Sequence, residues 1–309
     1  ASMPDTVITV TKANDGSKNV ISAVTVENTG NQDTSITVPS DAANYMDLSS
    51  LTTFADSLMK TADLKQYRIT GTINANMSII GIPINANIPM DFRLKLNADN
   101  TVQSAYINLD VPYFIGVLQQ DMTAKVYYED GVLYFDRNWE TSTGALWWKE
   151  YYDHHEYMKC TIDEFMANPM KYVYFCTNFT SMVENAINDA IAKSDQKAVR
   201  TGNIMFEEAL TGFYYNGSNQ WNVNLDAAHL INNSDFSDQM SITVGKGSNG
   251  ILNSISLSTR VLDMINLQLN NGQLVNADKS NVDMSVIPTG LSSNPNYVFG
   301  EVKVVETKK

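Results

Sequence analysis

The residues from Tyr67 to Leu96, YRITGTINANMSIIGIPINANIPMDFRLKL, decide the fold. The odd positions up to Ile79 are mostly apolar, and the even positions between them carry arginine, threonine, asparagine and serine. After Gly81-Ile82-Pro83 the phase reverses, so that the even positions from Ile84 onward are apolar. A period of two residues over this length is typical of antiparallel strands with one apolar and one polar face. The stretch therefore predicts a long hairpin whose apolar face other parts of the chain must cover.

Further strands are expected on both sides of this hairpin. Alternating or β-branched residues and turn dipeptides such as Asp130-Gly131, Asn216-Gly217, Asn249-Gly250 and Asn271-Gly272 indicate them. The expected strands are 105–111, the two arms of a hairpin over 124–137, 147–152, 213–215, 221–223, 240–244, 251–257, 261–269 and 274–286. These strands make two meanders, one on each side of a helical middle region.

Helices are expected in three places. Residues 42–62 carry apolar side chains at three- and four-residue spacing, which is typical of an amphipathic helix. In the middle region, Thr161 and Ser181 each stand three residues before a glutamate, the pattern of a capping box. Pro169 separates the two helices that these caps begin. Asp226 is expected to cap a short helix that ends near Leu230.

The chain divides by composition into three parts. Residues 1–41 are predicted to form a β-hairpin extension or a tether, and residues 42–290 the main domain. Residues 291–309 form a C-terminal tail. Its alternating stretch from Val298 to Val305 is expected to pair, as a strand, with the N-terminal extension.

Bulk composition narrows the functional class. The chain is 43% apolar, which supports a substantial core, and its formal net charge is −13. This charge argues against nucleic-acid binding and against electrostatic docking on anionic lipid. No uninterrupted apolar run is long enough for a transmembrane helix. The abundance of asparagine, serine and threonine favours an exported protein. The location that we expect is extracytoplasmic, either secreted or at the surface of a bacterial cell envelope.

The two cysteines, Cys160 and Cys176, have two interpretations. In an exported protein they are candidates for a disulfide that closes the helical segment between them. The alternative is a pair of buried free thiols. Their spacing alone is not a metal-binding pattern.

Three short motifs resemble metal-binding, nucleotide-binding or catalytic motifs, and each has a simpler structural interpretation. Asp153-His154-His155-Glu156 contains metal-ligand residue types, but adjacent histidines diverge on a strand or a helix, so a solvated loop or helix start is expected. Gly245 to Gly250 matches G-x-G-x-x-G, but a strand follows it, which favours a hairpin turn over a nucleotide site. Ser57-Leu58-Met59-Lys60 lacks the partner motifs of penicillin-recognising enzymes. No metal, cofactor or catalytic residue is therefore predicted.

The order of elements resembles the LolA/LppX-type lipoprotein carriers over roughly residues 42–287. The features that carry the resemblance are the helix around Leu51 to Met59, the strand from Gln66 to Thr72, the hairpin from Lys125 to Phe135, and the aromatic strand from Ala145 to Tyr152. The resemblance implies an α+β fold in which a curved antiparallel sheet forms an incomplete β-barrel and helices cover its concave face. It also implies an apolar ligand, such as an acyl chain, between sheet and helices. The first 40 residues have no counterpart in that fold.

Aromatic and methionine side chains near the helical region are the candidate ligand-binding residues. An apolar wall of this kind suits a lipid, although strand aromatics also serve as ordinary packing residues. The predicted ligand-binding residues are Trp147, Trp148, Tyr151, Phe165, Met166 and Met182.

The expected function is that of an exported, non-enzymatic binding or carrier protein for a hydrophobic small molecule or lipid, with a cell-envelope protein as a further possible partner. Two alternatives stay open at this point. One is a cell-surface interaction protein that recognises a protein or a glycan through the polar face of its sheet. The other is a hydrolase that uses a pair of carboxylates.

Overall fold

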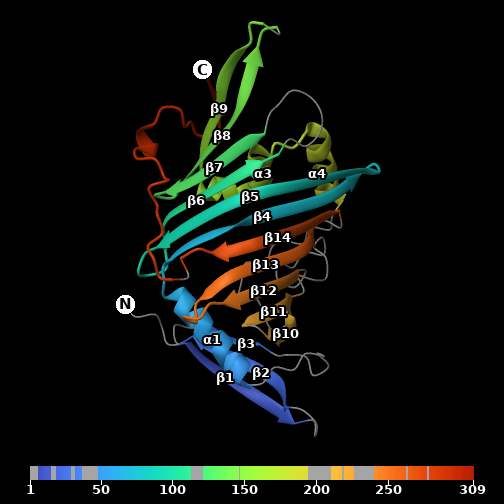
Figure 1. Ribbon diagram of the computed structural model, residues 1–309, viewed down its shortest axis with the longest axis vertical. Coiled ribbons are helices and arrows are strands. Elements are labelled where there is room, and N and C mark those ends of the chain that lie inside the picture. The colour runs from blue at the N-terminus through green and yellow to red at the C-terminus, as the bar shows by residue number, and fades with distance from the viewer. Residues whose placement is uncertain are drawn as a thin grey trace.

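The computed structural model describes residues 6–14, 19–28, 32–36, 48–112, 121–145, 147–193, 210–217, 219–225, 240–261, 264–276 and 278–309. Their strands form two sheets (Figure 1). The smaller sheet contains β1 (Thr6–Asn14), β2 (Asn19–Asn28) and β3 (Gln32–Ile36), paired antiparallel in that order. β1 and β2 thus form a β-hairpin, and β3 adds a third strand to it.

The main sheet has 12 strands in the order β10-β11-β12-β13-β14-β4-β5-β6-β7-β8-β9-β15. Neighbouring strands are antiparallel throughout, and the sheet is open, with β10 and β15 at its two edges. The bounds are β4 Gln66–Ile79, β5 Ile82–Leu96, β6 Val102–Val111, β7 Met122–Glu129, β8 Val132–Thr143, β9 Glu150–Thr161, β10 Leu210–Gly217, β11 Gln220–Leu225, β12 Met240–Lys246, β13 Leu252–Val261, β14 Ile265–Leu274 and β15 Lys303–Lys308. Two consecutive meanders thus join side by side where β14 pairs with β4.

The β4–β5 hairpin has the register that its sequence predicts. Ile79 pairs with Ile82 across the turn, and Met77 pairs with Ile84. The apolar positions Met77, Ile79 and Ile84 are buried, whereas Asn85 and Asn87 are exposed. The change of phase at Gly81 therefore puts the apolar residues of both strands on one face.

The structure describes four α-helices: α1 Leu48–Ala62, α2 Ile162–Ala167, α3 Pro169–Thr177 and α4 Ser181–Lys193. Buried side chains of α3 and α4 pack against apolar residues of the strands. The predicted capping box at Thr161 is present, because its hydroxyl accepts from the Glu164 N–H and the Glu164 carboxylate accepts from the Thr161 N–H. Pro169 is the first residue of α3, so the middle region contains three helices where two were predicted. The α+β class with an open antiparallel sheet is confirmed.

Helix α3 fills the space between itself and the sheet with side chains. Tyr172 stacks on Phe135 of β8 with 5.1 Å between ring centroids, and Phe175 meets the same ring edge-on at 6.2 Å. Arg137 of β8 donates to the Phe175 carbonyl at 2.9 Å and lies 4.2 Å from the Phe175 ring centroid. These contacts make the region between α3 and β8 a packed core.

Both cysteines are buried in this core and are not bonded to each other, as in the second of the two sequence interpretations. Cys160 ends β9 and Cys176 lies near the end of α3. They belong to the same apolar cluster as Phe135 and Tyr172, and burial rather than covalent linkage fixes them there.

The opposite face of the sheet is covered at one end, which the sequence did not predict. Leu291 and Tyr297, from the segment that follows β14, are buried against Tyr106, Tyr127 and Tyr134. The strand expected over residues 274–286 is wrong beyond Leu274, because residues 278–286 make no strand pairs. This segment instead bonds to side chains: the Val282 N–H donates to Gln66 Oε1 at 3.0 Å, and Arg93 donates to the Asp283 carbonyl at 2.6 Å.

The tail strand pairs elsewhere than predicted. β15 pairs with β9 at the edge of the main sheet, so its expected pairing with the N-terminal extension is wrong. The dipeptide Asn271-Gly272 is also not a turn but a bulge inside β14, where the register shifts between Asn270 and Gln273. Asn271 has φ +53°, and a Cβ on Gly272 would lie 2.1 Å from the Ile255 carbonyl oxygen. The close approach of the neighbouring strand therefore requires glycine at 272.

Three further expectations concern smaller elements. The turn predicted within Gly245 to Gly250 is present: residues 247–251 connect β12 to β13. The hairpin over β10 and β11 is also confirmed. The short helix expected after Asp226 lies outside the described residues. Among the helices that the structure describes, none combines the length and the apolar character needed to cross a bilayer.

Candidate functional site

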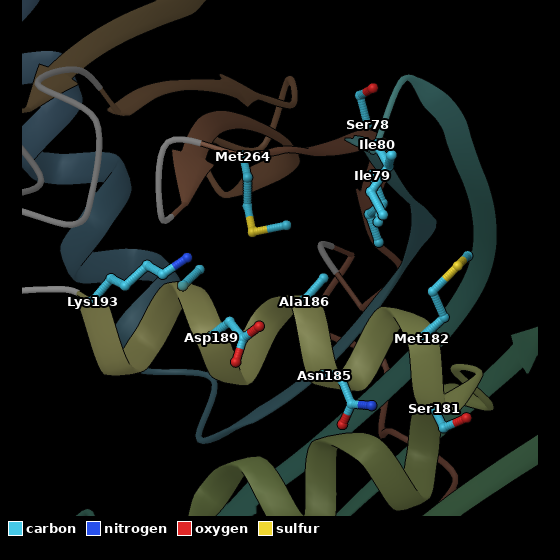
Figure 2. A pocket seen from close by; sticks show the side chains of 11 residues that line it. Ser78, Ile79, Ile80, Ser181, Met182, Asn185, Ala186, Asp189, Lys193 and Met264 are labelled. Carbon is cyan, nitrogen blue, oxygen red and sulfur yellow. The ribbon is translucent and has the colours of Figure 1, made fainter.

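A groove of about 760 Å³ lies between α4 and the turn of the β4–β5 hairpin (Figure 2). Its volume is within the range of small-molecule sites. Three regions of the chain meet in it: the end of β4, helix α4 and Met264, just before β14. The lining residues are Ser78, Ile79, Ile80, Ser181, Met182, Asn185, Ala186, Asp189, Ala190, Lys193 and Met264.

Helix α4 is held on the sheet by one of its faces and lines the groove with the adjacent face. Val183 and Ile187 are buried against Met77, Ile79 and Ile84 of the hairpin. Met182, Ala186, Asp189 and Lys193 follow at four- and three-residue spacing and form the stripe that lines the groove. The Tyr174 hydroxyl of α3 donates to Asn188 Oδ1 of α4 at 2.7 Å, which ties the two helices together.

The walls of the groove are apolar and its rim is polar. Figure 2 shows Met264 and Ile79 directed toward α4, with Met182 and Ala186 on the helix below them. Ser181, Asn185, Asp189 and Lys193 supply hydroxyl, amide and charged groups along the helix. Methionine on two walls gives a surface that adapts to ligands of different shape.

Ile80 at the lip of the groove has an unfavourable conformation. Its φ is +52°, which is rare for a β-branched residue, and its side chain is 92% exposed. The next residue, Gly81, has φ +77°, so the pair forms the left-handed turn for which Asn-Gly is the preferred sequence. Isoleucine at this position strains the backbone, and its side chain is not buried in return. Strained residues of this kind occur at functional sites.

A smaller hollow of about 380 Å³ adjoins the groove. The two share Ser78 and Met264, and the smaller one is also lined by Asn76, Arg260 and Asn266. The smaller hollow is polar, and Arg260 brings a guanidinium group to its lining.

The structure does not bring the six predicted ligand-binding residues together. Met182 lines the groove. Phe165 packs in the α3 core, 5.6 Å from the Tyr172 ring centroid, and Met166 is exposed on α2. Trp147, Trp148 and Tyr151 lie at the other end of β9, around the turn between β8 and β9, and are exposed.

The Asp153-His154-His155-Glu156 cluster lies within β9, so the loop or helix start expected for it is wrong. Its two histidines point to opposite faces, as strand geometry requires. His154 is 2.8 Å from Glu306 and 3.2 Å from Glu156, whereas His155 is 3.3 Å from Asp136 on the other face. Burial raises the pKa of Asp136, and the hydrogen bond with His155 opposes that rise. Within the described residues, no three potential ligands gather into a metal site.

Sequence reasoning missed Ile80, Ala190 and Met264. One signal for Ile80 was available: an apolar residue before Gly81 in a hairpin turn, where asparagine or aspartate is usual. No family model matches the sequence, and a search of curated proteins finds no match.

Proposed function

We propose that this protein binds a lipid or another amphiphile, with the apolar chain in the groove between α4 and the β4–β5 turn. It would act as an exported, non-enzymatic binding or carrier protein of a bacterial cell envelope. The observation that carries the proposal is the apolar lining of the groove, together with an exposed, strained Ile80 at its lip. Moving apolar surface from water into such a site contributes roughly 25 cal/mol per Å².

The likeness to LolA/LppX-type carriers supports this proposal and adds a more specific architecture to it. In this architecture the sheet would be an incomplete β-barrel, and the helices would cover its concave face. The guest then lies at the α4 end of the sheet, because the α3 end is filled by Phe135, Tyr172 and Phe175. The neighbouring hollow with Asn76, Arg260 and Asn266 would receive the polar head of the amphiphile.

A fluorescent fatty acid tests the proposal. Ala190 lines the groove, so Ala190→Phe places a ring in the space that the acyl chain needs. Loss of about 60 Å² of apolar contact corresponds to an affinity roughly tenfold weaker. Ala192→Phe is the matched control, because Ala192 is exposed on the same helix and does not line the groove.

The expected result is saturable uptake by the wild type and the Ala192→Phe variant, with weaker uptake by Ala190→Phe. Absence of uptake by the wild-type protein, or equal uptake by both variants, contradicts the proposal. Circular dichroism and thermal unfolding of the three proteins separate a blocked groove from a damaged helix.

One observation favours a second candidate, recognition of a neutral glycan by the polar face of the sheet. A row of uncharged polar side chains crosses six strands on that face: Asn224, Ser241, Ser258, Gln268, Asn74 and Asn87. The amides of Asn74 and Asn87 are hydrogen-bonded to each other, and Asn270 donates to Asn74 at 2.5 Å. Amides and hydroxyls both donate and accept, as sugar hydroxyls do. Binding to uncharged polysaccharides that Asn74→Ala weakens would favour this candidate.

A further inference from the structure

The β8–β9 hairpin ends in an exposed tryptophan pair that the groove does not use. In Figure 1 this hairpin projects beyond the other strands of the main sheet, with the end of the chain beside it. Trp147 is 83% exposed and Trp148 is 60% exposed. In contrast, Trp221 is fully buried, and Trp139 packs on His154 with 4.2 Å between ring centroids.

A tight turn holds the two indoles in this position. The Trp148 N–H donates to the Ala145 carbonyl at 3.0 Å, which closes the turn. Gly144 has φ +102°, and a Cβ there would lie 2.2 Å from the Trp148 carbonyl oxygen. Only glycine fits at this position, so the local sequence supports a backbone that leaves both rings in solvent.

Two of the lysines near the tip form ion pairs with carboxylates. Lys308 contacts Glu150 at 2.6 Å, and Lys309 contacts Glu140 at 2.6 Å and Asp153 at 2.9 Å. The Lys149 ammonium lies 5.6 Å from the Tyr151 ring centroid. Three lysines thus offset three carboxylates, so these side chains carry no net charge although the whole chain carries −13.

We propose that this tip docks on the surface of a lipid bilayer by inserting Trp147 and Trp148 among the head groups of neutral lipids. Indole prefers the membrane–water interface, because its ring is apolar and its N–H finds polar partners there. Because the formal charges of these side chains sum to zero, docking on a neutral bilayer relies on the two indoles and not on electrostatic attraction. The tip projects beyond the other strands of the main sheet (Figure 1), so both exposed rings can reach a flat surface. This inference does not depend on what the groove binds.

The test is co-sedimentation with phosphatidylcholine vesicles, followed by quenching of tryptophan fluorescence with brominated lipids. The double variant Trp147→Ser/Trp148→Ser is expected to bind at least roughly 100-fold more weakly, since each indole contributes about a factor of ten through buried apolar area. Phe299→Ser is the matched control, because it removes a half-exposed aromatic ring beside Lys159 at the opposite end of β9.

We expect the wild type and the Phe299→Ser variant to bind the vesicles and the double variant to lose binding. Added salt should hardly change the binding of the wild type. Unchanged unfolding curves show that the double variant is folded. The proposal is overturned if the wild type does not bind the vesicles, or if the double variant binds them as the wild type does. It is also overturned if the tryptophans are needed for binding a glycan or a protein but not a vesicle.

Discussion

Replacing Ile80 by asparagine is expected to stabilise the protein and to weaken ligand binding at the same time. At φ +52° the isoleucine occupies a region that costs an L-residue about 1–2 kcal/mol, whereas asparagine tolerates it. The side chain is 92% exposed, so little packing is lost. The variant also creates Asn-Gly, the preferred sequence for this turn. The free energy of unfolding should therefore rise by about 1 kcal/mol.

Urea unfolding of the ligand-free protein measures the first effect, and fatty-acid titration measures the second. If Ile80 forms the lip of the binding groove, its loss should reduce the affinity about three- to tenfold. Ile82→Asn is the control: Ile82 is half-exposed and lies at the start of β5, outside the groove lining. It should lower stability, because asparagine is unfavourable in a strand, and leave binding unchanged. An Ile80→Asn protein that is less stable than the wild type, or one that binds with full affinity, would refute the reasoning.

Three further predictions concern the sheet and the core that packs on it. Arg93→Gln should cost about 2–3 kcal/mol at pH 7, because the buried Arg93 bonds both Asp91 and the Asp283 carbonyl. Burial raises the pKa of Asp91, but hydrogen bonds from Arg93 and Arg68 outweigh it, so that pKa is lowered overall. Ionised Asp91 stabilises the folded protein above its unfolded-state pKa of about 4, and this stabilisation is lost as the pH falls through its lower folded-state pKa. The difference in unfolding free energy between the wild type and the variant should therefore shrink in acid. A difference that stays constant from pH 7 to 3 argues against this. Gly272→Ala should lower the free energy of unfolding by at least about 2 kcal/mol, because its Cβ would meet a backbone oxygen. Gly247→Ala is the control and should lower it less, since the neighbours of Gly247 are side-chain atoms. Equal unfolding midpoints for the two variants would contradict the close approach at the bulge. Burial raises the pKa of Cys176 to about 12, and burial also raises the pKa of Cys160. A thiol reagent at pH 8 should therefore label neither cysteine in the folded protein and both in urea. If no thiol reacts in urea without reductant, the two cysteines form a disulfide.

Local pattern predicted most of the sheet and the ends of several elements. Strands β4 and β5 alternate so regularly that their register follows from the side-chain period and the position of Gly81. The capping box at Thr161 and the turn at Asp130-Gly131 were likewise set by neighbouring residues. In each of these cases the residues that decide the structure are close in sequence.

The errors arose where distant residues decide the structure. Residues 281–286 alternate like a strand, but they lie on the polar face of the sheet because Gln66 and Arg93, about 190 to 216 positions earlier, bind their backbone. Asn271-Gly272 has the composition of a turn and becomes a bulge because Ile255 of β13 lies against it. The groove depends on the same kind of contact, since Met182, Ile80 and Met264 meet only after α4 has packed on the hairpin.

Native mass spectrometry of gently purified protein tests the central claim most directly. The account predicts a species heavier than the polypeptide by the mass of one amphiphile, which organic extraction releases and which Ala190→Phe reduces. A bare polypeptide mass, together with an empty extract and no uptake of added fatty acid, would contradict it.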